Sequence, residues 1–197
     1  MPGPTRTIYT VGHSTRTLDE LCRILQAHGV RAVADVRLIP RSRRYPHFND
    51  DALAVSLPGH GIEYHPFKSL GGRRRPRKDS PNGAWRNESF RGYADFLQTP
   101  AFEAALGELM ELAERVPTTT MCAEAVPWRC HRSLISDALL VRGWTVLDVT
   151  SAKKATAHKL PAFARVEGLR VTYPPEQPTL FEAPPRKVGG GRRRAGT

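Results

Sequence analysis

Short β-rich runs alternate with helical patterns along the first 150 residues of this 197-residue chain. That alternation is typical of a parallel α/β sheet, in which a helix follows each strand and returns the chain to the sheet. Five strands are predicted, at residues 7–12, 32–37, 62–67, 118–123 and 145–149, and a short late strand at 170–173 is expected at an edge.

Helical patterns fill most of the intervals between these strands. Leu18, Leu21 and Leu25 recur at helical spacing together with Cys22, and Gly29 is placed to end this first helix. Three further helical regions are expected, near 50–57, over 93–116 with a break at Thr99-Pro100, and over 130–143.

Two stretches lack this order. Residues near 68–92 are rich in Gly, Pro and Arg and are predicted to form a long basic loop, which in a compact domain is usually functional or disordered. From Pro174 onward apolar residues are nearly absent, which predicts a disordered tail. The sequence therefore predicts one α/β domain over 1–173, with a mainly parallel sheet of roughly five strands flanked by helices, and a basic tail over 174–197.

The formal net charge of +11 and the pI near 10.2 favour an acidic partner, with nucleic acid first and an anionic membrane surface second. A solvated basic surface without a partner is the alternative. No apolar run approaches the length of about 18 residues that spans a bilayer, and the first residues lack a signal-peptide pattern, so no membrane location is expected. Three cysteines, an odd number, favour reduced thiols and a cytoplasmic protein.

Polar residues that could carry chemistry follow the predicted strands. In open parallel α/β sheets, ligands bind outside the carboxyl ends of the strands, so side chains at those ends converge. We therefore expect a site at this edge of the sheet, although Ser14 could simply cap the first helix. The candidates for binding substrate or phosphate are His13, Ser14, Arg37, Arg41, Gly71, Gly72, Arg73, Arg74, Cys130 and Arg132.

The candidates for catalysis are Glu124, Asp35, Cys122 and His131. Asp35 lies in a strand that is predicted to be buried, where a carboxylate is costly unless it is paired, so we expect either a functional role or an ion pair with Arg37. Glu124 leaves the fourth strand, and together with Asp35 it could supply a base and an electrostatic stabiliser. The helix start that follows could hold a phosphate.

The two thiols near this helix start leave several roles open. Cys122, Cys130 and His131 could hold zinc, but C-x7-C-H does not match the spacings of zinc ribbons, so no metal or cofactor is predicted. A thiolate nucleophile is physically sensible there, because the helix dipole lowers a thiol pKa. Burial of both cysteines as small apolar residues is the favoured structural role.

The basic loop contains "LGGRRRPRK", in which two glycines precede five basic residues. Glycines let a backbone approach phosphate, and Trp85, Phe90 and Tyr93 lie nearby as stacking surfaces for bases. A mobile solvated loop is the alternative.

The tail contains one apolar island, "EQPTLFE", in which Gln177, Leu180 and Phe181 form a Q-x-x-L-F pattern. The pattern resembles the peptide by which bacterial replication and repair proteins dock on the sliding clamp. Docking of this peptide on its own domain is the alternative.

Six stretches of the chain, in order over about residues 7–150, resemble the bacterial family known as domain of unknown function 488: "IYTVGHSTR", "VADVRLIPRSR", "IEYHPFKSLGGRR", "FRGYADFL", "MCAEAVPWRCHRSLISDAL" and "VLDVT". The resemblance implies a cytoplasmic α/β domain and supplies no reaction. It marks as the signature of the family Cys122, Glu124, Cys130, His131 and Arg132.

Three functional hypotheses follow. The first is a hydrolytic, glycosylase-like enzyme that acts on DNA in repair, with a metal-dependent nuclease as its close variant. The second is an enzyme that acts on a small anionic molecule or nucleotide through a reactive Cys122 or Cys130. The third is a non-catalytic DNA-binding adaptor.

Overall fold

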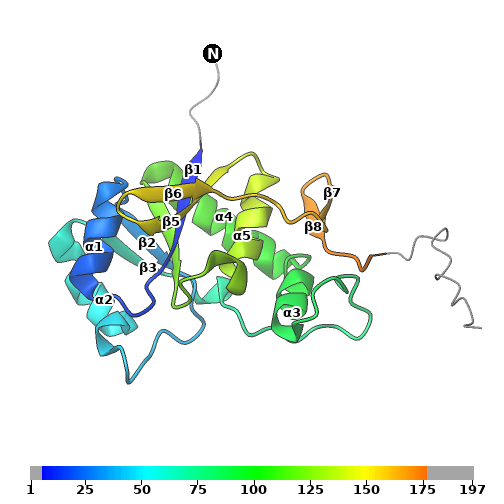
Figure 1. Cartoon of the computed structure of the whole chain (residues 1–197), viewed down its shortest axis with the longest axis horizontal. Coiled ribbons are helices and arrows are strands. Elements are labelled where there is room, and N and C mark those ends of the chain that lie inside the picture. The colour runs from blue at the N-terminus through cyan, green and yellow to red at the C-terminus, as the bar shows by residue number, and fades with distance from the viewer. Residues whose placement is uncertain (1–5, 177–197) are drawn as a thin grey trace, which may run out of the picture.

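Six strands form the central sheet of the computed structural model, which describes residues 6–176 (Figure 1). Five of them are parallel, as predicted, and the sixth is antiparallel to β5. Their spatial order is β3 (Glu63–Pro66), β2 (Ala32–Asp35), β4 (Thr118–Cys122), β1 (Thr7–Gly12), β5 (Thr145–Ser151) and β6 (Lys154–Ala157).

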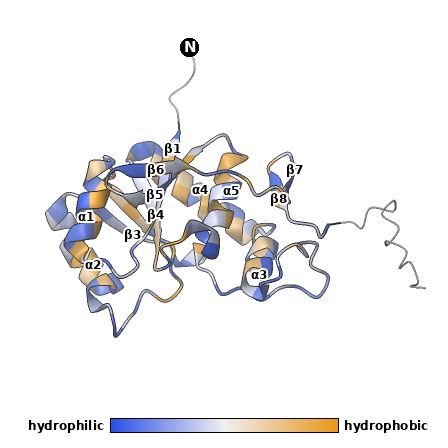
Figure 2. Cartoon of the chain, in the orientation of Figure 1, coloured by the Kyte–Doolittle hydropathy of each residue, from blue (hydrophilic) through white to orange (hydrophobic). Residues whose placement is uncertain are grey.

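Helices cover both faces of this sheet (Figure 1). One layer holds α1 (Leu18–Ala27) and α2 (Asp50–Ser56), and the other holds α3 (Glu88–Phe96), α4 (Pro100–Arg115) and α5 (Arg132–Leu140). Figure 2 shows hydrophilic and hydrophobic residues on each of α1, α2 and α3, as expected for helices with one face against the sheet and one toward water.

Alternating side chains of the strands enter the two cores. In β2, Val33 packs with the α1 and α2 layer, whereas Ala32 and Ala34 pack with the α4 and α5 layer. This period of two is the geometry of an extended strand, and burial on both faces is typical of a parallel sheet.

Local signals set the helix ends. Thr17 caps α1: its hydroxyl accepts from the Glu20 backbone N–H at 3.2 Å, and the Glu20 carboxylate accepts from the Thr17 N–H at 2.7 Å. The cap is therefore not Ser14. Gly29, at φ +69°, follows the helix as predicted. The break at Thr99-Pro100 is confirmed, with Thr99 as the N-cap of α4.

Two strand predictions need correction. The sequence signal missed β6, because all four of its residues are exposed and its only apolar residues are two alanines. The late strand β8 (Arg170–Thr172) does not join the edge of the sheet. It pairs with β7 (Arg165–Glu167) in a separate two-stranded hairpin.

The predicted basic loop is anchored rather than free. The buried Asp95 carboxylate on α3 accepts hydrogen bonds from the Arg77 backbone N–H, the Ser80 hydroxyl and the Asn82 amide, at 2.7–2.8 Å. The loop also crosses α3 closely, since a Cβ on Gly92 would lie 2.3 Å from the Arg74 carbonyl oxygen.

The strand order creates one topological switch point that matters for function. β2 continues to β3 on one side and β4 continues to β5 on the other, so the chain leaves these two neighbours in opposite directions. Ligands of open α/β sheets bind at such a point, outside the carboxyl ends of the strands. Among residues 6–176, no helix combines the length and apolar character that would span a bilayer.

Candidate functional site

A cavity of about 220 Å³ opens at the switch point, beside the carboxyl ends of β2 and β4. Residues from three separate parts of the chain line it, namely Arg37, Leu38, Ile39, Gly72, Arg73, Cys122, Ala123 and His131. Five of these eight are among the predicted site residues, so the convergence expected from the sequence is present here.

Asp35 and Arg37 form a buried, bidentate ion pair below the cavity. Arg37 donates from Nε to Asp35 Oδ1 at 2.8 Å and from Nη2 to Oδ2 at 2.6 Å, and Tyr64 donates to Oδ2 at 2.9 Å. Burial alone would lower the pKa of Arg37, but the Asp35 carboxylate outweighs it and raises that pKa. Asp35 is 1% exposed and fully engaged, so it anchors Arg37 and does not face substrate water.

His13 extends this buried network as a neutral group. Its Nδ1 donates to the Ser14 carbonyl oxygen at 3.0 Å, which leaves Nε2 to accept from Arg37 at 3.2 Å, and its ring stacks on Phe48 at 4.1 Å. Burial, and then the Arg37 charge, lower the pKa of His13 to about 4. His13 therefore positions Arg37, and is 3% exposed.

Cys122, Cys130 and His131 form a compact cluster at the cavity. Their sulfur and nitrogen atoms lie within 4.8 Å of one another, and Cys130 Sγ is 3.7 Å from His131 Nδ1. The cluster comes from the last residue of β4 and the turn before α5. Cys122 and His131 line the cavity, while Cys130 is buried beneath them.

The two thiols shift each other's pKa in opposite directions. The neighbouring Cys122 thiol is the largest cause that lowers the pKa of Cys130, and the Arg132 charge lowers it further, whereas the neighbouring Cys130 and burial raise the pKa of Cys122.

Arg132 is a buried cation without a carboxylate partner among residues 6–176. Its Nη1 donates to Thr10 Oγ1 at 2.7 Å and its Nη2 to the Glu124 carbonyl oxygen at 2.5 Å, and its Nε has no partner. At 1% exposure it cannot reach a solvent phosphate directly. Its positive charge instead acts to lower the pKa of both Cys122 and Cys130.

Arg73 is the freely presented cation of the cavity. It is exposed, and it makes no ion pair or hydrogen bond within the described part of the chain. Its φ of +60° is costly for a non-glycine residue, and such strain often occurs at functional sites. Arg73 is therefore the predicted phosphate-binding residue that the structure leaves available.

Glu124 and Asp35 have different surroundings, because Asp35 is buried and Glu124 is not. Glu124 is exposed on the loop after β4, and its Oε1 accepts from the Val126 backbone N–H at 3.0 Å. A Cβ on Gly12 would lie 1.9 Å from the Glu124 carbonyl oxygen, so glycine allows β1 to end against this loop. The role of Glu124 and Asp35 as a catalytic carboxylate pair stays a prediction.

Four other predicted residues take structural positions. Ser14 lies two residues after the end of β1, with φ +52°. Arg41 is exposed and pairs with Asp50 and Asp51. Arg74 donates hydrogen bonds to the carbonyl oxygens of Gly71 and Ser69, and its guanidinium lies 3.8 Å from the centroid of the Phe96 ring. Gly71 packs on Leu38. Gln177, Leu180 and Phe181 lie outside the described residues.

Of the aromatic residues proposed as stacking surfaces, Tyr93 is fully buried and unavailable to a base. Trp85 and Phe90 are half-buried, and Trp85 packs against Phe90, Phe163 and Tyr173. Trp128, on the loop between β4 and α5, is instead 73% exposed.

The sequence pattern missed several residues that build the site. Tyr64 and Phe48 hold the Asp35–Arg37–His13 network, and Leu38 and Ile39 line the cavity. The run "RLIP" at 37–40, one residue beyond the end of β2, was an available signal, because apolar residues beyond a strand end are either buried or at a binding surface.

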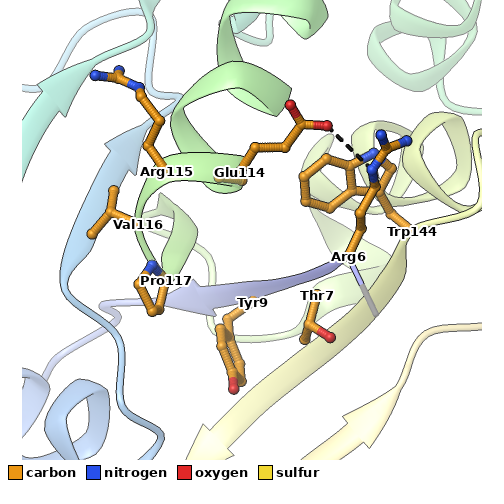
Figure 3. Close-up of a pocket in the computed structure, with 9 residues that line it drawn as sticks. Arg6, Thr7, Tyr9, Glu114, Arg115, Val116, Pro117 and Trp144 are labelled. Atoms are coloured by element: carbon orange, nitrogen blue, oxygen red, sulfur yellow. Dashed lines mark ion pairs between the residues drawn. The ribbon is translucent and has the colours of Figure 1, made fainter. Parts of the chain in front are cut away.

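A larger cavity of about 530 Å³ lies at the opposite, amino-terminal edge of the sheet (Figure 3). Its charged groups include the Arg6–Glu114 ion pair, with N···O 3.2 Å, and its walls include Tyr9 and Trp144. It holds no thiol or imidazole. The smaller cavity is therefore the better candidate, because the reactive groups lie there.

The chain matches the family model for the domain of unknown function DUF488 over residues 17–139, which includes the entire thiol and imidazole cluster. No curated protein and no solved structure matches the chain. Since the family match spans more than half of the 197 residues, the protein belongs to the DUF488 family.

Proposed function

We propose that this protein is a hydrolytic enzyme that acts on nucleic acid, as in DNA repair, with its reacting centre at the cavity between the ends of β2 and β4. One observation carries the proposal: a free cation, Arg73, and the Cys122–Cys130–His131 cluster line the same cavity at the switch point of the sheet.

Charge and exposed surface favour nucleic acid as the substrate class. The tail over 177–197 holds five basic residues and one acidic residue, so seven of the eleven net positive charges belong to residues 1–176. Leu38 and Ile39 are exposed at the cavity and offer apolar contacts to a base or sugar, and Trp128 is exposed on the loop between β4 and α5.

We assign the activation of water to the cluster and not to the carboxylates. Asp35 is held by Arg37 and Tyr64, and Glu124 is bound to its own loop. A hydrolytic step needs a group within hydrogen-bond reach of the attacking water, and Cys122 and His131 line the cavity in which that water would lie.

The size of the cavity favours a second candidate, a free nucleotide as substrate. About 220 Å³ is smaller than the roughly 300–1,000 Å³ of common ligand pockets, so one base or sugar fits and a duplex does not. DNA would have to present one unstacked nucleotide there. Competition between mononucleotides and labelled DNA separates the two candidates.

The test is binding of a labelled single strand and duplex across a salt series. We expect a chain that ends at Glu176 to keep a steep salt slope, and Arg73→Ala to reduce that slope by about 0.9 through the loss of one phosphate contact. Arg115→Ala removes the same charge at the opposite edge of the sheet and should leave the slope unchanged. Loss of all binding with the tail, or equal effects of both variants, would contradict the proposal.

A further inference from the structure

We propose that Cys122, Cys130 and His131 bind a thiophilic divalent metal ion of the zinc class, with the fourth coordination position open to the cavity. The inference rests on the proposed hydrolytic function for its role, because a metal-bound water would supply the nucleophile. Metal binding itself depends only on how the three side chains are arranged.

The donor atoms are already near the distances that a tetrahedral site requires. With metal–sulfur and metal–nitrogen bonds of about 2.3 and 2.05 Å, neighbouring ligand atoms in a tetrahedron lie about 3.6–3.8 Å apart. Cys130 Sγ and His131 Nδ1 are separated by 3.7 Å. All three donors lie within 4.8 Å of one another, so an ion needs to draw them together by at most about 1 Å.

The tautomer of His131 suits a metal ligand. Its Nε2 lies 3.0 Å from the Val36 carbonyl oxygen, which can only accept, so Nε2 carries the proton and Nδ1 presents its lone pair to the thiols. Histidines that bind metals commonly donate their other ring N–H to a carbonyl or carboxylate in this way, which fixes the ring.

The surroundings hold the imidazole and leave room beside it. The buried Tyr93 ring lies 5.0 Å from the His131 ring. Gly72 also lies against the imidazole, and a Cβ there would be only 2.9 Å from Nδ1. A residue with a side chain would therefore crowd the nitrogen that has to bind the ion.

The number and type of donors decide the class of metal. Two thiolates and an imidazole select zinc over magnesium or calcium, which prefer oxygen ligands. Three protein donors with one open position are the arrangement of catalytic zinc, whose bound water has a pKa near 7. Among residues 6–176 no fourth donor joins the cluster.

The charge of the site favours an anion at the open position. A divalent ion, two thiolates and a neutral imidazole sum to zero, and buried Arg132 adds one positive charge without a carboxylate partner in the described chain. Hydroxide or a substrate phosphate would offset that charge. Arg73 at the mouth of the cavity points to the same class of ligand.

The spacing C-x7-C-H differs from that of zinc ribbons, whose ligands come in closely spaced pairs along the chain. In the fold, Cys122 ends a strand, and Cys130 and His131 precede a helix. The strand end and the helix start create the site, and spacing along the chain does not limit it.

The test is metal binding by the purified, reduced full chain after treatment with a chelator. We expect one zinc per chain by elemental analysis, and thiolate-to-cobalt charge transfer with intense tetrahedral d–d bands when cobalt replaces zinc. Cys122→Ser should weaken zinc binding at least tenfold. Cys22→Ser, in the core of the opposite layer, should have no effect.

Failure to bind either zinc or cobalt above trace would overturn the inference, and the cluster would then be a reactive thiol pair or a disulfide. An unchanged affinity in Cys122→Ser would place the ion elsewhere and overturn it too. The cobalt spectrum of the unaltered chain needs no variant to fold. Because these measurements contain no nucleic acid, their outcome tests the metal site independently of the salt series, which tests the proposed function.

Discussion

Asp35 and Arg37 are both removed from water, and each offsets the cost of burying the other. A buried pair of this kind adds little compared with apolar residues, but the removal of one partner leaves an uncompensated charge. Stability and site geometry are therefore linked at these residues, because the ion pair that balances the buried charges of the core also positions Arg37 at the cavity.

Asp35→Asn should lower the free energy of unfolding by about 3 kcal/mol, because Arg37 remains buried without its counter-charge. Urea unfolding followed by circular dichroism measures the change. The matched control is Asp79→Asn, which breaks the exposed Arg77–Asp79 pair and should alter stability little. Equal losses in the two variants would show that Asp35 is not an essential partner.

A second buried ionic group joins His158 to Asp137 and Asp148, at 2.8 and 3.2 Å. Burial would lower the pKa of His158, but hydrogen bonds to the two carboxylates outweigh it and raise the pKa to about 9. The folded state thus holds a proton that the unfolded chain releases near pH 6.5. This contribution to stability is complete below pH 6.5 and is lost as the pH rises through 9.

We expect the unfolding free energy to fall by roughly 2 to 3 kcal/mol more between pH 6 and pH 9.5 in the parent chain than in His158→Gln. His60→Gln is the control, because its ring makes no hydrogen bond or ion pair with any residue in 6–176. Parallel pH profiles for the parent and His158→Gln would contradict the prediction.

At the scale of elements, one connection carries most of the site. Between the end of β4 and the start of α5 the chain places Cys122, Cys130, His131 and Arg132. The loop after β3 contributes Gly72 and Arg73 to the lining of the same cavity. That loop keeps its place because it crosses α3 at a glycine and is bound to Asp95.

Two helical glycines should therefore respond to alanine with opposite signs. Gly92→Ala should destabilise the domain by more than about 2 kcal/mol, because its Cβ would meet the loop backbone at 2.3 Å. Gly107→Ala, in α4, meets nothing within 4 Å and should stabilise by about 0.5–1 kcal/mol through helix propensity. Thermal unfolding of the two variants measures both effects. A stabilising Gly92→Ala would mean that the loop does not pack there.

For the whole molecule, the basic domain and the tail are proposed to act on different partners. The domain would hold nucleic acid at the carboxyl edge of its sheet, and the tail would dock on a sliding clamp through Leu180 and Phe181. The separation is testable because the peptide lies outside the described domain.

Replacement of Leu180 and Phe181 together by alanine should reduce affinity for a purified bacterial sliding clamp at least tenfold, since apolar anchors dominate such peptide contacts. Calorimetry with the full chain measures the loss. Thermal unfolding of the domain serves as the control and should not change. A lower unfolding temperature in the variant would instead favour docking of the peptide on its own domain.

Sequence patterns predict the parallel sheet and most strand positions, and they place the candidate residues at one edge of the sheet. Strand positions follow from the hydrophobic periodicity of short segments, and the parallel arrangement follows from the alternation of strands with helices. The sequence also identified the cysteines, His131 and Arg73 as candidates. β6 escaped because an exposed edge strand needs no apolar alternation.

Only the tertiary structure decided which candidates meet. Distances between side chains on different strands depend on strand order, which no local pattern encodes, and the order β2-β4-β1 places Cys122 and His131 beside the end of β2. In the folded chain Asp35 is engaged in an ion pair with Arg37, and Glu124 is bound to the backbone of its own loop. Burial of charge imposes such pairing, because an unpaired carboxylate in the core is too costly to keep.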